Sequence, residues 1–292
     1  MRRSVDGSVS ILTDERSLSL EELLSRPHAR TMDLTALLPR LKSPDADLPL
    51  TLDLDAGALT DGQQSYPLRG GLPLLMPRRL QPYFVRRLEV PVAAANDSFL
   101  QYFLLASIKQ SGEINAAPSD VHFRRHLARM HEFVAGCGGL VLDVGCDDPA
   151  LSAALFPPAA SYVGLDPFCL RDEPFRLIGV GEFLPFQDST IDNVVFNTSL
   201  DHILDWRRAV NEAHRVLVAG GALYVCTLIW EHAADLLADA VHFHHFRLGE
   251  LLSGLEGFDV EAIRAYDYKA NTHRYGLYLL ARKRDAAPDR VA

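Results

Sequence analysis

From about residue 138 onward, short apolar runs alternate with longer stretches in which apolar positions recur every three or four residues. The short runs predict buried strands, and the longer spacing predicts amphipathic helices. Strands that alternate with helices in this way predict a mostly parallel α/β sheet covered on both faces, closed by an antiparallel hairpin. The predicted strands are 140–144, 161–165, 176–180, 192–197 and 221–228, the helices are 149–155, 205–217 and 247–255, and the hairpin strands are 258–267 and 274–283.

Residues 1–80 follow a different pattern, which predicts a small N-terminal β-containing module. A short helix is expected at 18–24, with Ser19 as its N-cap and Glu22 completing a capping box. Alternation predicts a strand at 50–54. The segment 66–77 predicts two strands around a Gly-Gly turn, at a sheet edge because of its prolines.

Residues 81–135 predict a helical lid or linker between the two regions. Its strongest amphipathic stretches are 99–108 and 123–133. The sequence therefore divides into the module 1–80, the lid 81–135, the α/β domain 136–285 and a disordered tail 286–292.

Composition and charge narrow the function. With 292 residues, of which 48% are hydrophobic, the chain can bury a sizeable core. A net charge of −9 disfavours nucleic acid as the main partner. The four cysteines form no C-x-x-C pair, which disfavours a zinc ribbon. The N-terminus lacks the apolar core of a signal peptide, and no apolar run approaches the roughly 20 residues of a membrane helix, so we expect a cytoplasmic protein without a membrane partner.

Two apolar runs end in an acidic residue, as in nucleoside sites of parallel α/β sheets. Residues 139–146 read Gly-Leu-Val-Leu-Asp-Val-Gly-Cys, and residues 162–166 read Tyr-Val-Gly-Leu-Asp. A tight turn after the first strand brings backbone close to a ligand, and a carboxylate after the second can accept hydrogen bonds from both ribose hydroxyls. The pattern predicts an adenosine-containing cofactor.

Further blocks follow in order: Gly-Glu-Phe-Leu-Pro-Phe-Gln-Asp at 181–188 and Arg-Val-Leu-Val-Ala-Gly-Gly at 215–221. With the two acidic strand ends, these blocks resemble class I S-adenosylmethionine-dependent methyltransferases, over about residues 120–285. The nearest branch is that of the ubiquinone and menaquinone C-methyltransferases. The resemblance implies a Rossmann-like seven-stranded sheet and S-adenosylmethionine as cofactor.

The resemblance also implies roles for individual residues. Gly145 would let backbone approach the methionine end of the cofactor, Asp143 would hold its amino group, and Asp166 would bind the ribose diol. Alternatively, the two aspartates cap the helices that follow them. The predicted cofactor-binding residues are Asp143, Gly145, Cys146, Asp166, Pro167, Gly181, Glu182, Phe183, Asn197, Thr198 and Ser199.

The chain departs from the family pattern at three positions of the cofactor-facing blocks, besides the loss of a lysine and a proline at 218 and 219. Asp147 and Pro149 stand where the family has its second and third glycines, and Val180 stands where it has an aspartate. Pro149 suits a first helical turn, so the fold can survive. These departures keep open a catalytically inactive, methyltransferase-like binding or scaffold protein. A nicotinamide-dependent oxidoreductase is disfavoured because the glycine triad is missing.

The segment 65–76 resembles the end of a zinc-ribbon-related domain found in activators of RNA and protein methyltransferases. The metal cysteines of that family are absent, so the resemblance implies no zinc. The module could shape the substrate entrance, or contact a second copy or a partner protein.

The residues for chemistry are sought just beyond the fourth strand of the α/β domain. His202 is the candidate general base, with Asp201 to orient it, although a structural histidine is the alternative. The run 241–246 is rich in histidine and could line an acceptor pocket, pack in the core or, least favoured, bind metal. We assign His244, His245 and Tyr102 to acceptor binding and predict no metal. The prediction is methyl transfer from S-adenosylmethionine to a small metabolite or glycan precursor.

Overall fold

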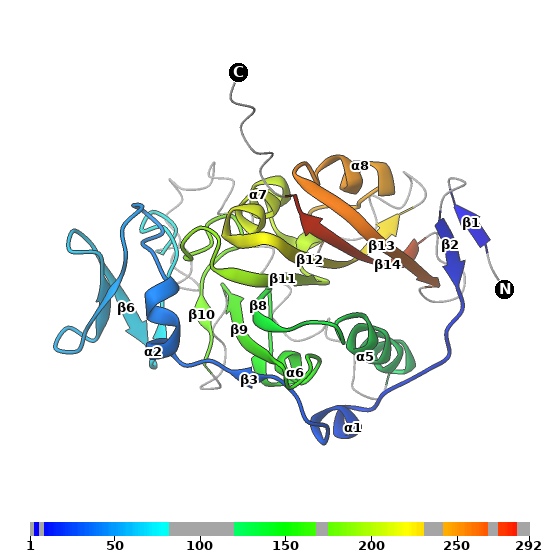
Figure 1. The fold of residues 1–292 in the computed structure, drawn as a ribbon, viewed down its shortest axis with the longest axis horizontal. Coiled ribbons are helices and arrows are strands. Elements are labelled where there is room, and N and C mark those ends of the chain that lie inside the picture. Colours follow the sequence, from blue (N-terminus) through cyan, green and yellow to red (C-terminus); the bar gives the residue numbers. More distant parts are fainter. Residues whose placement is uncertain are drawn as a thin grey trace, which may run out of the picture.

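The computed structural model describes residues 3–5, 9–81, 120–167, 175–230, 242–267 and 274–284. The predicted helix at 99–108 and the predicted tail at 286–292 lie outside these ranges. Within them the chain builds a ten-stranded sheet and a separate four-stranded sheet (Figure 1). Every helix of the described ranges is too short or too polar to cross a bilayer.

The central sheet contains the predicted α/β strands in the order β13-β14-β12-β11-β8-β9-β10. The five strands from β12 to β10 pair in parallel, whereas β14 is antiparallel to both its neighbours. This order confirms the predicted Rossmann-like sheet with a closing antiparallel hairpin. The bounds are β8 Gly139–Val144, β9 Ala160–Asp166, β10 Leu177–Ile178, β11 Ile191–Asn197, β12 Leu217–Trp230, β13 Phe258–Asp267 and β14 Arg274–Lys283.

Helices cover both faces of this sheet. In Figure 1, α7 and α8 lie on one side, and α5 and α6 lie on the other. Aspartates begin three of them, since Asp120, Asp148 and Asp205 accept hydrogen bonds from backbone N–H groups of the first turns of α5, α6 and α7. The bounds are α5 Val121–Phe133, α6 Pro149–Ala153, α7 Trp206–Val216 and α8 Leu248–Ser253.

The core is divided by the sheet into two layers. Leu140, Leu142 and Val144 of β8 belong to one buried cluster, and Val141 belongs to the other. The same alternation continues in β11 and β12. Because successive side chains point to opposite faces of a strand, a run that is apolar throughout can bury both faces, as parallel sheets require.

The first eighty residues contribute to both sheets. β2 runs parallel to β13 and extends the central sheet, while β3 pairs with the start of β9. The predicted strand at 50–54 and the predicted Gly-Gly turn are confirmed in the small sheet, whose order is β4-β5-β6-β7. The bounds are β1 Arg3–Val5, β2 Val9–Leu12, α1 Leu20–Leu24, β3 Arg30–Thr31, α2 Leu34–Leu37, η1 Leu38–Arg40, β4 Thr51–Asp53, β5 Ala58–Thr60, β6 Ser65–Arg69 and β7 Leu72–Pro73.

The small sheet meets the central sheet beside β10. The Leu75 amide donates to the carbonyl oxygen of Ile178 at 2.8 Å, and Leu74, Met76 and Val180 share one buried cluster. The predicted strand at 176–180 is reduced to two residues. A Cβ added at Gly179 would lie 2.9 Å from the Leu75 carbonyl oxygen, so this chain segment is held close to the module. The division into separate domains stays a prediction.

Candidate functional site at the carboxyl edge of the sheet

Asp143, near the end of β8, is a buried carboxylate at the centre of the candidate site. Its side chain is 1% exposed, and the Tyr162 hydroxyl donates to Oδ2 at 3.0 Å. Oδ1 has no hydrogen-bond partner among the described residues. Burial raises the pKa of Asp143 from 3.8 to about 7, against the opposing effect of the Tyr162 hydrogen bond. A donor group such as an amine would satisfy this oxygen.

Gly145 lies at the turn after β8. Besides the predicted approach of backbone to the cofactor, the fold itself requires a glycine at this position. Its φ is +82°, which favours glycine, and an added Cβ would lie 2.4 Å from Cβ of Ser199. Ser199 is buried, and its hydroxyl donates to the carbonyl oxygen of Val144. The absence of a side chain at 145 therefore lets the β8 turn pack directly against the segment that follows β11.

In this turn Asp147 adopts a backbone conformation typical of glycine, the residue that the family pattern has at this position. Asp147 has φ +48°, a left-handed conformation that aspartate tolerates better than most residues. Its amide donates to Asp166 Oδ2 at 3.1 Å, and the Arg176 guanidinium donates to its carbonyl oxygen. Asp148 and Pro149 then begin α6 as its N-cap and first residue. The departures from the glycine pattern leave the strand–turn–helix connection intact.

Asp166 is the last residue of β9, and Pro167 follows it. Asp166 is 8% exposed and lies one register position beyond Leu165, which is paired with Val144 of β8. Cys146 is also buried, and burial raises the pKa of its thiol well above the usual range. The thiol is therefore protonated and acts here as a small apolar side chain.

The predicted segment 181–183 packs tightly against the start of α7. An added Cβ at Gly181 would lie 2.8 Å from Cδ1 of Ile203. Glu182 is 1% exposed; its Oε1 accepts from the Asp205 amide at 3.3 Å, and Arg208 donates to its carbonyl oxygen. Glu182 Oε2 has no hydrogen-bond partner among the described residues, and burial raises the pKa of the carboxyl to about 7.

The ring of Phe183 makes cation–π contacts with two arginines. The Arg208 guanidinium lies 3.9 Å from the ring centroid, and the Arg79 guanidinium lies 5.5 Å from it. Arg79 follows the small sheet in the chain, so the N-terminal region reaches the predicted adenine side.

The end of β11 carries the candidate chemistry. Asn197 ends the strand, and Thr198 turns the chain with φ +54°. A short 3₁₀ helix, η3 (Leu200–His202), then presents Asp201 and His202. Asp201 is 2% exposed, and its Oδ1 lies 3.9 Å from His202 Nε2. The predicted pair is brought together at a separation longer than a hydrogen bond.

His242 also faces this pair, although it was not among the predicted site residues. Its Nε2 lies 3.7 Å from Asp201 Oδ2, and its ring stacks on that of His202 with centroids 4.5 Å apart. The amides of Phe243 and His244 both donate to the carbonyl oxygen of Asp201, which fixes the loop to η3. The histidine-rich run was the only sequence signal for this residue, and nothing in its spacing selects position 242.

The predicted acceptor-side residues border this cluster or lie outside the described ranges, since the rings of His245 and His242 have centroids 6.3 Å apart and the His244 amide donates to Asp201. His244 Nε2 lies 2.9 Å and 3.0 Å from the carbonyl oxygens of Ile203 and Leu204, which require it to act as a donor. His245 packs edge-on against the ring of Trp230, with centroids 4.2 Å apart. Tyr102 lies outside the described residues.

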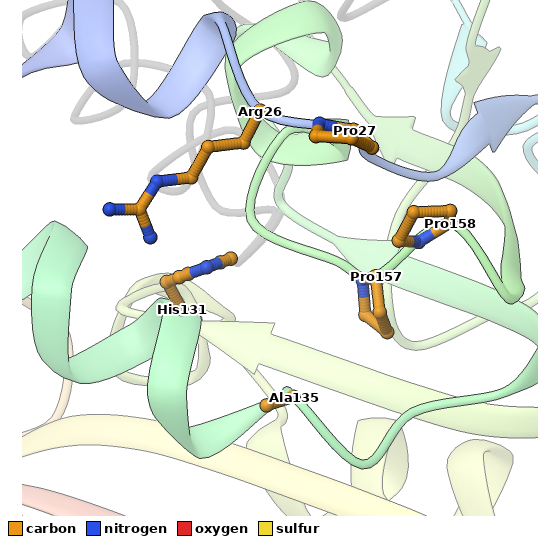
Figure 2. A pocket seen from close by; sticks show the side chains of 6 residues that line it. All are labelled: Arg26, Pro27, His131, Ala135, Pro157 and Pro158. Atoms are coloured by element: carbon orange, nitrogen blue, oxygen red, sulfur yellow. The ribbon is translucent and has the colours of Figure 1, made fainter.

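A separate hollow lies at the opposite end of the sheet. Its volume is about 410 Å³. Figure 2 shows the side chains that line it, which come from the segment after α1, from the end of α5 and from the segment before β9. Its lining residues are Arg26, Pro27, His131, Ala135, Pro157 and Pro158, none of which is a predicted site residue. Parallel α/β sheets bind ligands at the carboxyl ends of their strands, so this hollow is not the candidate site.

Comparison with known proteins agrees with the sequence blocks. Residues 142–225 match the family model described as "Methyltransferase domain". A "probable S-adenosylmethionine-dependent methyltransferase" of Mycolicibacterium smegmatis is 29% identical over 163 residues, which cover 50% of this chain. The match spans 62% of the length of that relative.

Solved structures give more distant similarities. Burkholderia thailandensis 1,6-didemethyltoxoflavin-N1-methyltransferase, solved with 1,6-didemethyltoxoflavin and S-adenosylhomocysteine, is 17% identical with a TM-score of 0.49. The alignment covers 68% of this chain and 92% of that one. The YcgJ protein from Bacillus subtilis is 16% identical with a TM-score of 0.45, covering 55% of this chain and 99% of that one.

The predicted quinone branch and the zinc-ribbon-like resemblance find no support in these matches and stay predictions. The family match lies on the strands and turns that carry Asp143, Gly145 and Asp166. Asp143 and Glu182 each have a buried carboxylate oxygen without a hydrogen-bond partner in the part of the chain that the structure describes, and these oxygens fit a ligand that brings amine or hydroxyl donors. Together the family match, the relative and these oxygens support a class I methyltransferase domain around residues 142–225, with S-adenosylmethionine as its cofactor.

Proposed function

We propose that this chain transfers a methyl group from S-adenosylmethionine to a small-molecule acceptor. One observation carries the proposal: the predicted cofactor-binding residues and the predicted catalytic residues lie at the same edge of the sheet. The acidic ends of β8 and β9 lie beside the segment after β11, because Gly145 packs on Ser199. When bound, S-adenosylmethionine supplies a methyl group that is already activated. The protein therefore has to bind the cofactor and the acceptor, orient them, and exclude water.

The cofactor would be held by the predicted residues at the strand ends. Asp143 Oδ1 would accept from the cofactor's amino group, and Asp166 would accept from the ribose hydroxyls. Val180 lacks the carboxylate of the family pattern, so adenine recognition would fall to the backbone around Gly181 and to the ring of Phe183. The remaining proposed contacts are Cys146, Pro167, Glu182, Asn197, Thr198 and Ser199.

The acceptor would enter beside η3. His202 is 18% exposed in its side chain and would take a proton from the acceptor, and the buried Asp201 would orient the imidazole. A small acceptor suits the net charge of −9 better than nucleic acid does. A metabolite or a glycan precursor would belong to this class. His244, His245 and Tyr102 keep their proposed roles on the acceptor side.

A second candidate function is a catalytically inactive, methyltransferase-like binding or scaffold protein. The observation that favours it is the use of Asp166 inside the protein, because its Oδ2 already accepts the Asp147 amide. Asp147 also adds a negative charge where family members have glycine. In this case the N-terminal region, which packs beside β10, would be the surface for a partner protein or a second copy.

Calorimetric titration with S-adenosylmethionine and S-adenosylhomocysteine separates the two functions. Micromolar binding followed by formation of S-adenosylhomocysteine with an acceptor panel is the expected result. The panel should include phenols, catechols, hydroxy acids and amines, at pH 8. Absence of binding at millimolar ligand would favour the scaffold function.

A further inference from the structure

The cluster of Asp201, His202 and His242 is more than a base and its orienting acid. One oxygen or ring nitrogen from each residue lies within 4.8 Å of the others. The two imidazole Nε2 atoms approach different oxygens of a single buried carboxylate, at 3.9 Å and 3.7 Å. Three groups with metal-ligand chemistry thus converge on one point, from η3 and from a loop forty residues later in the chain.

These separations suit an ion between the groups. Hydrogen bonds between nitrogen and oxygen are about 2.7–3.2 Å long, which is shorter than either distance. Two metal–ligand bonds of about 2.1 Å at a tetrahedral angle span about 3.4 Å. The three ligand atoms, which lie within 4.8 Å of one another, would therefore approach one another by up to about 1.4 Å on binding, which rotation of two partly exposed imidazoles can supply.

The backbone around the cluster is already fixed. The Asp201 carbonyl oxygen accepts from the amides of Phe243 and His244, directly after His242. The ring of His244, in turn, is hydrogen bonded to the carbonyl side of η3. The two segments that carry the ligands are therefore tied to each other without using the ligand atoms, as a preorganised site requires.

We propose that Asp201, His202 and His242 form a binding site for a divalent transition-metal ion. Two neutral imidazoles and one carboxylate favour zinc, iron, cobalt or nickel over magnesium and calcium, which prefer oxygen ligands. The carboxylate is 2% exposed, whereas the side chains of His202 and His242 are 18% and 15% exposed. Coordination positions would thus remain open toward the surface on the imidazole side.

The open coordination positions of the ion bear on the class of acceptor, and this step rests on the proposed function. They lie beside the segment after β11, where the acceptor would enter. An ion there would bind an acceptor through oxygen, so acceptors with a phenolate, a catechol or an α-hydroxy acid group would be preferred. His202 would then serve as a ligand, and the ion would lower the pKa of the acceptor hydroxyl so that its proton passes to solvent without a general base.

The test is cobalt binding to the full-length protein, freed of any histidine tag and of metal. Co²⁺ is titrated while its visible absorption is recorded, with Zn²⁺ as competitor, for the wild type and for His242→Ala, His202→Ala and Asp201→Asn. His28→Ala is the matched control, because His28 is an exposed histidine just before β3, which pairs with the amino-terminal start of β9. Thermal unfolding checks each variant, and the two histidine variants carry the result if Asp201→Asn does not fold.

The expected result is about one Co²⁺ per chain, displaced by Zn²⁺, with affinity at least about tenfold weaker in each ligand variant and unchanged in the control. No saturable binding by the wild type, or equal affinity in the ligand variants and the control, would overturn the proposal. S-adenosylmethionine titration of the same samples separates the two proposals. Metal binding without cofactor binding would remove the proposed function alone, and cofactor binding without metal binding would remove the metal site alone.

Discussion

Two regions at the carboxyl edge of the sheet are built in opposite ways. The turn after β8 is local, since residues 143–149 are continuous and their pattern is visible in the sequence. The Asp201–His202–His242 cluster is composite, since its members come from η3 and a distant loop. The turn has lost two family glycines and kept its backbone, whereas the cluster has no sequence pattern and has a defined geometry. A familiar motif can therefore be altered without loss of the connection it makes, and a site can arise where no motif exists.

Removal of the Asp166 carboxylate should have the largest effect. Asp166→Ala would remove the acceptor proposed for both ribose hydroxyls. Since each hydrogen bond to a charged group contributes about 1.5–3 kcal/mol, S-adenosylmethionine binding should weaken by at least about 100-fold. Calorimetry on folded protein measures this, with Asp55→Ala, at an exposed acid in the turn between β4 and β5, as control. Unchanged affinity would take Asp166 out of the site.

The composite cluster is tested by His202→Ala. Loss of a base or of a metal ligand should lower the rate of S-adenosylhomocysteine formation by about 100-fold, within the usual range for general acid–base catalysis. S-adenosylmethionine affinity should change little, because the cofactor is proposed to bind at β8 and β9. Full turnover in the variant would show that His202 is structural. An equal loss of cofactor affinity would show that the two regions are not separate.

The contact between the two regions is tested by Gly145→Ala. The new Cβ would collide with Ser199, and the residue would be held at φ +82°. The expected loss is about 2–3 kcal/mol in the free energy of unfolding, measured with urea. Gly145→Ala combined with Ser199→Gly removes the collision but not the strained φ, so it should recover only part of the loss. No destabilisation by the single change would mean that the turn is not packed on Ser199.

The buried carboxylate of Asp143 should make the free energy of unfolding depend on pH. Its pKa is raised to about 7 in the folded protein, so the folded state binds a proton that the unfolded state has released. Its contribution is therefore fully favourable below about pH 4 and is lost as pH rises to about 7, by at most about 1.4 kcal/mol per pH unit. Asp143→Asn should flatten urea-measured stability between pH 5 and 7. An identical pH profile would contradict the raised pKa.

The smallest effect is expected from Asp147→Gly, which restores the family residue. Glycine relieves the left-handed φ but costs conformational entropy in the unfolded chain, so stability should change by less than about 1 kcal/mol. Removal of the negative charge should tighten S-adenosylmethionine binding by a few-fold, measured by calorimetry. Weaker binding would show that the carboxylate contributes to the site instead of opposing the cofactor.

The sequence by itself determined the order and type of the elements. The hairpin strands 258–267 and 274–283 and the helix at 205–217 follow from apolar spacing and turn residues, because side-chain periodicity directly records which face is buried. The acidic ends of β8 and β9 were equally visible, since each lies beside its own strand. The position of the N-terminal segments was not visible. Three short strands, β1 to β3, join the central sheet and four others, β4 to β7, form a separate sheet, although their local patterns are alike.

Only the tertiary structure decided how distant residues meet. It made Gly145 a contact for Ser199, turned Glu182 toward the start of α7, and selected His242 from a run of similar histidines. None of these follows from local periodicity, because each depends on where a loop returns after leaving the sheet. Local burial patterns are encoded by nearest neighbours in the chain, whereas convergence of side chains is fixed by packing between elements that the sequence separates by tens of residues.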